Sequence, residues 1–289
     1  LGLVLLFILV LIVRTLRFKP LAQPPVAEAP VSLDHDKIVQ DMADMIRCAT
    51  VSYPEEERID RREFAKFEAL LAERFPRIYS ACSFEKIGKT GLLFLLKGRS
   101  SEKPSVCMAH YDVVPATEEL WERPAFQGIL EKDVLWGRGT LDTKATVNGV
   151  LSGAQNLIKQ GFTPKQDIYF AFSGGEEVNG RGAVNSVDYF EENKINVTLV
   201  GDEGGAVVTN VFPGVKTPAA MIGTAEKGMI DLEYRVRSSG GHASAPKPHT
   251  PVGILSRACC AVEGHPFPAH LTPPVAKMYD TLGRHSGFL

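Results

Sequence analysis

The amino-acid sequence predicts an α/β fold in which strands and helices alternate along the chain. Three short apolar runs, at residues 105–108, 167–173 and 196–200, have the length of buried strands. Apolar residues recur at helical spacing at residues 38–46, 64–75, 147–158 and 183–192. This alternation is typical of a sheet that carries helices on its faces.

The composition is that of an ordinary globular domain. The chain has 289 residues, of which 44% are hydrophobic and 23% charged, and its formal net charge is −2. No basic stripe marks a nucleic-acid-binding surface, so we expect no nucleic acid partner. The five cysteines form neither a CxxC metal motif nor the even set of a disulfide framework.

The N-terminus differs in composition from the rest of the chain. Residues 1–13 are apolar apart from Gly2, and Arg14, Arg17 and Lys19 follow. We interpret residues 1–18 as a partial single-pass membrane anchor; a signal-peptide core is the alternative. Which side of the membrane the rest of the chain occupies stays open. The Pro-rich residues 19–33 predict an extended tether.

Further elements complete the prediction. Asp34 or Asp36 caps the first helix of the folded part. Residues 78–87 and 92–97 predict a hairpin, and residues 129–136, 219–222 and 230–236 predict strands. A last helix is expected at residues 254–262.

Asp142 stands where the glycine-rich stretch WGRGTL, residues 136–141, leads into a helix that Gly161 ends. The most common use of aspartate in this place is as the N-cap of the helix. A functional role for Asp142 therefore depends on the side chains that it meets.

Potential metal ligands follow each of the three predicted buried strands. In chain order they are His110, Asp112, Glu176, Glu177 and Asp202. Because ligand sites in α/β sheets lie outside the carboxyl ends of the strands, we expect these side chains to converge with Asp142. One imidazole with several carboxylates and no thiolate suits zinc or a similar divalent ion. The number of acids suggests two ions that share Asp142.

Four motifs occur in a fixed order: HYDVVP at residues 110–115, GRGTLDTK at 137–144, GEE at 175–177 and DEGG at 202–205. Together they resemble the signature blocks of the aminoacylase/carboxypeptidase family of two-zinc metallopeptidases, and within it the carboxypeptidase S and N-acyl-amino-acid hydrolase branch. The resemblance implies a zinc-peptidase-like catalytic domain with a central mixed sheet flanked by helices. It also implies an inserted α+β lid or dimerisation domain.

The resemblance implies a set of metal ligands. One zinc ion would be held by His110, Asp142 and Asp202. The other would be held by Asp142, Glu177 and a histidine that has no counterpart in this sequence. We interpret the later histidines of the chain as surface or loop residues; they are His249, His265, His270 and His285.

Other residues receive supporting roles by the same resemblance. Asp112 would accept a hydrogen bond from the second ring nitrogen of His110. Glu176 would be the general base, which takes a proton from water and passes it to the leaving amine. His242 would stabilise the oxyanion. The family often has a second aspartate where this sequence has Thr143, so we expect altered hydrogen bonding there without loss of metal.

The implied domain organisation has four parts. Residues 1–18 are the anchor, 19–33 the tether, 34–215 an incomplete catalytic domain and 216–289 the start of the lid. The unmatched histidine and the rest of the lid imply a longer chain than the one given.

The implied function is that of a zinc-dependent hydrolase with two ions per complete chain. Its substrate would carry an amide bond next to a free carboxylate, in a peptide C-terminus or an N-acyl amino acid, and the lid could pair two copies as a homodimer. The alternative is a catalytically inactive, metal-binding homologue with a binding or regulatory role. Retention of Glu176 argues against it, because a scaffold needs no base. An accessory or structural membrane protein is a third hypothesis, suggested by the anchor alone.

Overall fold

The computed structural model describes residues 2–22, 32–245 and 248–287. They divide into two compact units, one formed by Ala27–Glu203 and the other by Leu1–Val26 with Gly204–Leu289. The domain boundaries predicted from the sequence stay predictions. Most of the predicted tether, residues 23–31, lies outside the described part of the chain, and so do residues 246–247.

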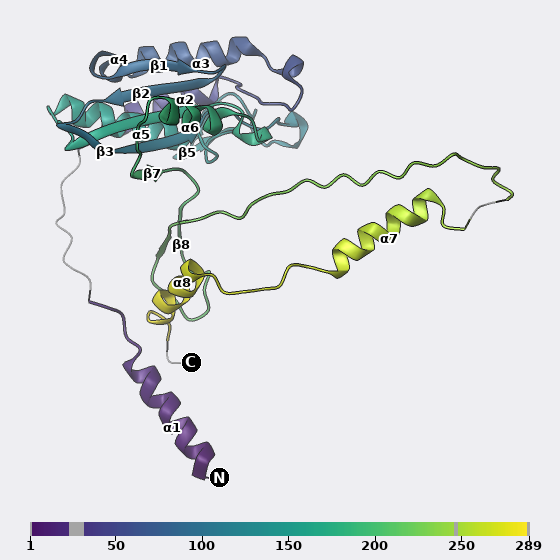
Figure 1. The fold of residues 1–289 in the computed structure, drawn as a ribbon. Coiled ribbons are helices and arrows are strands. Elements are labelled where there is room, and N and C mark those ends of the chain that lie inside the picture. Colours follow the sequence, from purple (N-terminus) through teal and green to yellow (C-terminus); the bar gives the residue numbers. More distant parts are fainter. Residues whose placement is uncertain (1, 23–31, 246–247, 288–289) are drawn as a thin grey trace. The chain divides into compact units, whose positions relative to one another are not determined.

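The unit Ala27–Glu203 is built on a five-stranded sheet with the order β1-β2-β6-β3-β7 (Figure 1). Its strands are β1 (Ser83–Ile87), β2 (Gly91–Leu96), β3 (Ser100–His110), β6 (Gln166–Ser173) and β7 (Leu199–Gly201). β1 pairs with β2 and β2 with β6 in antiparallel fashion, whereas β3 runs parallel to both β6 and β7. The prediction of a central mixed sheet flanked by helices is confirmed.

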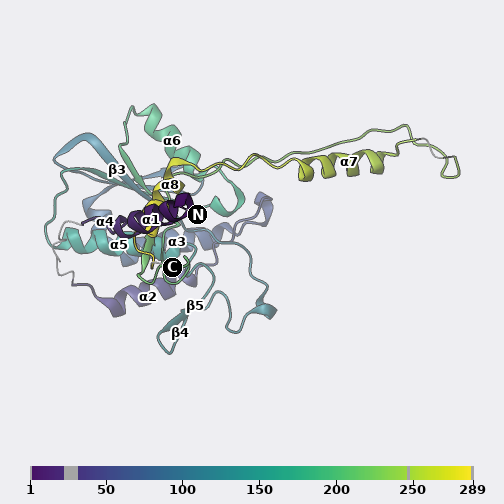
Figure 2. The same ribbon diagram turned by 90° about the horizontal axis from the view of Figure 1, so that it is seen from below.

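Helices cover both faces of the sheet. The first face carries α2 (His35–Ile46), α3 (Arg61–Arg74), α4 (Pro76–Ala81) and α5 (Lys144–Lys159), and the second carries α6 (Gly182–Glu192). Figure 2 shows α6 across the sheet from α2 and α5. Because side chains alternate along a strand, Phe170 and Phe172 of β6 enter the first core while Tyr169 and Ala171 enter the second.

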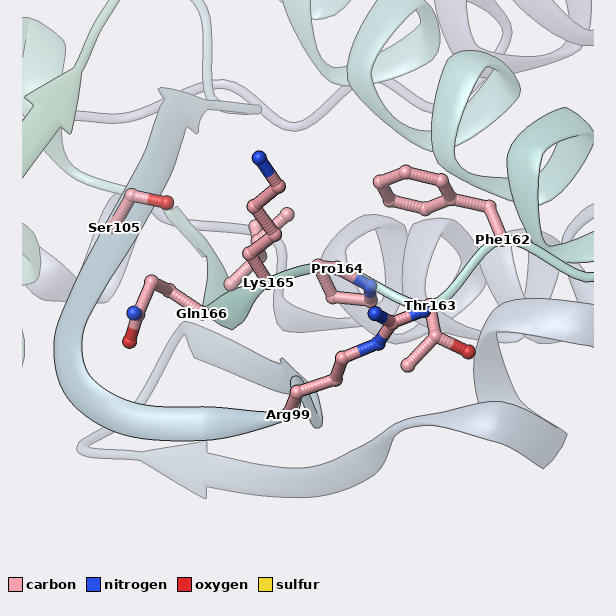
Figure 3. Close-up of a pocket in the computed structure, with 8 residues that line it drawn as sticks. Arg99, Ser105, Phe162, Thr163, Pro164, Lys165 and Gln166 are labelled. Carbon is pink, nitrogen blue, oxygen red and sulfur yellow. The ribbon is translucent and has the colours of Figure 1, made fainter.

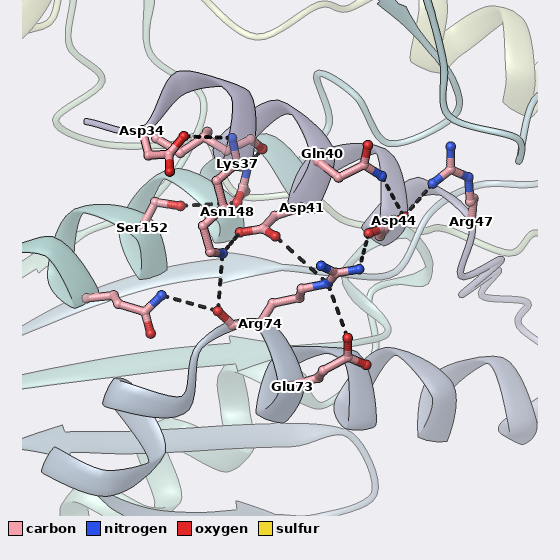
Figure 4. Close-up of polar contacts among 12 residues, drawn as sticks. Asp34, Lys37, Gln40, Asp41, Asp44, Arg47, Glu73, Arg74, Asn148 and Ser152 are labelled. Atoms are coloured by element: carbon pink, nitrogen blue, oxygen red, sulfur yellow. Dashed lines mark hydrogen bonds and ion pairs between the residues drawn. The ribbon is translucent and has the colours of Figure 1, made fainter.

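A polar network ties α2 to its neighbours (Figure 4). Asp34 caps α2, as one of the two predicted alternatives, by accepting the N–H of Lys37 at 3.1 Å. Asp41 is 1% exposed and forms an ion pair with Lys37. Arg74 of α3 donates to Asp44 at 2.6 Å. These contacts hold α2 from its first turn to Asp44, and after Ile46 the chain leaves the helix and continues through residues 47–52.

Two predicted strands differ from those in the structure. The strand expected at residues 78–87 begins at Ser83, because Pro76 opens the short helix α4 at its first position. The strand expected at residues 129–136 is a hairpin of β4 (Ile129–Glu131) and β5 (Val134–Trp136). Lys132 and Asp133 form its turn with φ of 52° and 61°, the left-handed conformation that two-residue hairpin turns need.

Among the described residues of this unit are also three short 3₁₀ helices: η1 (Glu56–Arg58), η2 (Glu118–Leu120) and η3 (Glu176–Val178). The second unit contains α1 (Gly2–Arg17), the paired strands β8 (Ala206–Val208) and β9 (Ala219–Met221), α7 (Pro251–Gly264) and α8 (Pro273–Gly283). β9 and α7 lie where a strand and a helix were predicted. Residues 230–236, predicted as a strand, have no regular secondary structure.

The predicted membrane localisation is wrong. Within the ranges that the structure describes, every helix is too short or too polar to span a membrane.

Candidate metal centre

The candidate ligands lie where parallel strands end. β3 ends at His110, which is paired in register with Ser173 at the end of β6, and β7 runs parallel to β3 on its other side. The segments that follow β6 and β7 therefore start from the same edge of the sheet as His110. This is the convergence that the sequence predicts.

Three side chains form a group that could hold a metal ion. His110, Asp142 and Glu177 each offer one ligand atom, and these atoms lie within 4.8 Å of one another. Nε2 of His110 is 3.0 Å from Oδ1 of Asp142. The side chain of His110 is 2% exposed and that of Asp142 70% exposed. The cluster therefore has a buried nitrogen at its base and a carboxylate facing solvent.

The turn that carries Asp142 is closed by a hydrogen bond from the backbone N–H of Lys144 to the carbonyl of Gly139, at 3.1 Å. The N-cap of α5 is Thr143, whose side chain makes no capping bond. Asp142 is therefore not the N-cap of this helix, and the interpretation of this aspartate as a helix cap is wrong. Its carboxylate contacts His110 instead.

Asp112 holds two parts of the centre at once. Nδ1 of His110 lies 3.0 Å from the backbone carbonyl oxygen of Asp112 and 3.4 Å from its Oδ1. The carboxylate also accepts the backbone N–H of Glu176 at 3.2 Å and that of Glu177 at 3.3 Å. The side chain is fully buried. The ring thus forms its hydrogen bond with the backbone carbonyl of Asp112, and the carboxylate lies slightly farther away. The contacts between this carboxylate and the two glutamates were not predicted from the sequence.

Gly175 allows the backbone N–H groups of Glu176 and Glu177 to face the carboxylate of Asp112. It precedes η3 with φ of 97°, in the left-handed region that favours glycine. The chain turns there, so that the first N–H groups of η3 face Asp112. The two glycines after the apolar strand were the only sequence signal for this turn.

Glu203, rather than the predicted ligand Asp202, approaches the ring. Oε1 of Glu203 is 3.3 Å from Nε2 of His110, and its side chain is 24% exposed. Asp202 is exposed, and its carboxylate accepts the backbone N–H of Glu203 at 2.9 Å. One of the pair therefore faces His110 while the other faces solvent.

Glu176 lies at the margin of the cluster. Its Oε2 is 3.7 Å from Nε2 of His110, and its side chain is 58% exposed. Glu177, the next residue, belongs to the group of potential ligands. The two adjacent glutamates thus occupy different places, as a division between base and ligand requires.

The charges of the centre shift the pKa values of its members. Burial would lower the pKa of His110, but hydrogen bonding and the charges of Asp112 and Glu203 raise it to about 10. Burial and the charge of Asp142 raise the pKa of Glu177. For Asp112, the bonds from His110 outweigh burial and lower the pKa. Carboxylates thus concentrate negative charge around Nε2 of His110, which is the environment that attracts a divalent cation.

The donor set therefore fits zinc. One imidazole nitrogen and carboxylate oxygens are ligands of borderline and hard divalent ions, and no thiolate lies in the group. Asp112 supplies the outer hydrogen bond that commonly orients a metal-ligating histidine.

His242 belongs to the second unit, where its Nδ1 lies 2.8 Å from the hydroxyl of Ser244. Its predicted role at the oxyanion stays a prediction. The later histidines are exposed, as expected; they are His249, His265, His270 and His285.

A hollow of about 610 Å³ lies elsewhere on the first unit (Figure 3). Arg99, Phe162 and Gln166 are among the residues that line it. Gln166 begins β6 and Ser173 ends it. The hollow is therefore at the opposite end of the parallel strands from His110 and takes no part in the centre.

Comparison with known proteins identifies the family. The profile of peptidase family M20/M25/M40 matches residues 106–281. A probable carboxypeptidase S-like 2 of Dictyostelium discoideum is 33% identical over 290 residues, which cover 96% of this chain and 56% of that protein. The N-fatty-acyl-amino acid synthase/hydrolase PM20D1 of Mus musculus is 35% identical over 227 residues, covering 77% of this chain and 45% of that protein.

The chain thus spans about half the length of these curated relatives. A crystal structure of human carnosine dipeptidase 1 has the same fold, with a TM-score of 0.50 and 19% identity over 58% of this chain and 38% of that one. The family match covers the segment that carries His110, Asp142, Glu176 and Glu177. The chain belongs to peptidase family M20/M25/M40.

Proposed function

We propose that the protein is a zinc-dependent hydrolase that cleaves an amide bond next to a free carboxylate. The observation that carries the proposal is the grouping of His110, Asp142 and Glu177 within 4.8 Å, with Glu176 beside them, in a chain of this family. The relatives are named as a carboxypeptidase and as an N-fatty-acyl-amino acid hydrolase. Both names favour a substrate with a free carboxylate, a peptide C-terminus or an N-acyl amino acid.

Two zinc ions per complete chain would share Asp142. The first would be held by His110, Asp142 and an acid after β7, for which the 3.3 Å approach to the ring supports Glu203 in place of Asp202. The second would be held by Asp142, Glu177 and a further ligand. Bound zinc would supply Lewis acidity toward the substrate carbonyl and would ease deprotonation of water.

Glu176 would move the proton. Its side chain is 58% exposed and stands beside the ligand cluster, so a substrate and a water molecule can both reach it. As general base it would take a proton from the attacking water and then give it to the leaving amine. Asp112, which accepts its backbone N–H at 3.2 Å, would hold it in place.

His242 and residues 216–289 would complete the site as part of a lid. His242 would donate to the oxyanion, and the lid would offer the surface through which two copies form a homodimer. The presence of Glu176 beside the ligands favours an enzyme over the inactive, metal-binding alternative, because metal binding alone needs no base.

Hydrolysis of matched substrates tests the proposal. The protein is assayed with an N-acyl amino acid and with the corresponding N-acyl amino acid amide, which lacks the free carboxylate. We expect hydrolysis of the acid, loss of activity after treatment with a chelator and recovery when zinc is returned. Equal rates on both substrates would refute the proposed requirement for a free carboxylate. Activity that survives treatment with the chelator would refute the proposed dependence on a metal ion.

A further inference from the structure

Lys144 is an unusual residue in the core of the first unit. Its side chain is fully buried at the start of α5. Nζ donates to the carbonyl of Met45 at 3.1 Å and to that of Cys48 at 2.6 Å, and it lies 5.4 Å from the centroid of the Phe67 ring. Burial of a charged amine is unfavourable. An apolar side chain of similar length would fill the same space without this cost. The presence of a lysine with two hydrogen bonds at this position therefore calls for an explanation.

The backbone and the aliphatic part of Lys144 contact the turn that carries Asp142. The backbone N–H of Lys144 donates to the carbonyl of Gly139 and closes the turn. The aliphatic part of the side chain passes beneath Gly139, where an added Cβ would lie 3.3 Å from Cδ of Lys144 and 2.7 Å from Cγ1 of Val113. The turn at Gly139 therefore packs between the side chain of Lys144 and Val113, which belongs to the segment after His110.

The amino group of Lys144 is connected to the segment of His110 through residues 45–52. Residues 45–52, which accept the bonds from Lys144, continue into a short parallel pairing with the chain beyond β3. The hydroxyl of Thr50 donates to the carbonyl of Tyr111, and the N–H of Val113 donates to the carbonyl of Thr50 at 3.0 Å. These bonds lie on either side of Asp112. Residues 45–52 are therefore bonded both to the segment of His110 and Asp112 and, through Lys144, to the turn of Asp142.

We propose that Lys144 is a positioning residue, which acts through residues 45–52 to fix the distance between the metal ligands His110 and Asp142. The proposal rests on the proposed function, because it needs this site to bind zinc. It assigns the buried hydrogen bonds to ligand geometry rather than to the stability of α5 alone. A role in stability alone would lower the unfolding midpoint and leave the affinity of the folded protein for zinc unchanged.

Zinc affinity of matched variants separates the two roles. The zinc dissociation constant is measured by competition with a chromophoric chelator, at a temperature where circular dichroism shows every variant folded. Lys144→Met removes the two bonds and keeps the length of the side chain. Lys66→Met is the matched control, since Lys66 donates to the carbonyl of Arg47 in the same segment but from the solvent side. Leu71→Ala, a truncation in the same core, controls for lost stability.

We expect Lys144→Met to raise the zinc dissociation constant about 10- to 100-fold, the usual effect of losing a group that orients a ligand. Lys66→Met and Leu71→Ala should stay within about twofold of the wild type. An unchanged constant for Lys144→Met would overturn the proposal. Wild-type protein that binds no zinc would instead refute the proposed function, so the two failures are distinguishable.

Thr50→Val keeps the proposal testable if Lys144→Met does not fold. It removes the hydroxyl that bonds to Tyr111 at the far end of the same segment, with little change of shape. A weaker affinity for zinc would support transmission through residues 45–52. An affinity equal to that of the wild type would overturn it.

Discussion

Replacement of Asp112 by asparagine keeps the shape of the side chain and removes its charge. The carboxylate accepts the N–H groups of Glu176 and Glu177 at 3.2 and 3.3 Å and lies 3.4 Å from Nδ1 of His110. An asparagine side chain has one oxygen, so its NH₂ group must face one of these donors. One N–H group of η3 then loses its acceptor.

The size of the effect follows from these contacts. A buried donor without a partner costs about 1–3 kcal/mol of unfolding free energy. Residues that orient a metal-ligating histidine are typically worth about 10- to 100-fold in metal affinity. We therefore expect Asp112→Asn to lower stability by about 1–3 kcal/mol and to raise the zinc dissociation constant about 10- to 100-fold.

Asp167→Asn is the matched control for this variant. Asp167 is 1% exposed and accepts the N–H of Gly98 at 2.8 Å near the start of β6, away from the metal centre. Urea unfolding and chelator competition are measured for both variants. The control should lose stability and keep its affinity for zinc. If both variants keep full zinc affinity, Asp112 does not organise the centre and the reasoning fails.

Three further predictions use other parts of the structure. Glu203→Gln should weaken zinc binding more than Asp202→Asn does, and the reverse order in chelator competition would restore Asp202 as the ligand. Gly175→Ala should lower the thermal unfolding midpoint by an amount equivalent to about 1–2 kcal/mol, because φ of 97° strains an L-residue; an unchanged midpoint would contradict this. Bonds from Lys97 and Gly98 outweigh burial and lower the pKa of Asp167, so its contribution is present above its unfolded pKa of about 4 and is lost as pH falls through the lower folded value. Stability should therefore decline in acid less steeply for Asp167→Asn than for wild type, as urea titrations at several pH values would show.

The main elements of the fold were predictable because their signals are local. The apolar runs before His110 and Glu176 form β3 and β6, and helical spacing marks α2, α3, α5 and α6. The errors arose where one residue changes the geometry. Pro76 turns the first half of an expected strand into α4, and the turn at Lys132 and Asp133 divides another strand in two.

The sequence was sufficient to predict which segments of the chain meet at the site, but not which residue of each segment faces it. His110 and Glu177 lie close together because β3 and β6 are parallel and end at the same edge of the sheet, and Asp142 reaches His110 from the turn before α5. The choice between Asp202 and Glu203 depends on which residue faces the ring after β7, and a shift of one residue reverses it. The sequence pattern does not fix that residue.

Contacts between distant segments were beyond the sequence pattern. Lys144 binds carbonyl groups 99 and 96 residues earlier in the chain, and Asp112 binds N–H groups 64 and 65 residues later. Both use backbone groups as partners. Such partners leave no trace in the residue types of either segment.

The most direct test of the central claim compares Glu176→Gln with Glu177→Gln. Turnover of an N-acyl amino acid and zinc bound per chain are measured for both variants. We predict that Glu176→Gln lowers turnover by about 10²- to 10⁴-fold with its zinc content unchanged, because glutamine cannot accept a proton. Glu177→Gln should lose zinc. Loss of zinc from Glu176→Gln with retention in Glu177→Gln would contradict the assigned roles, and full turnover in both variants would contradict the hydrolase itself.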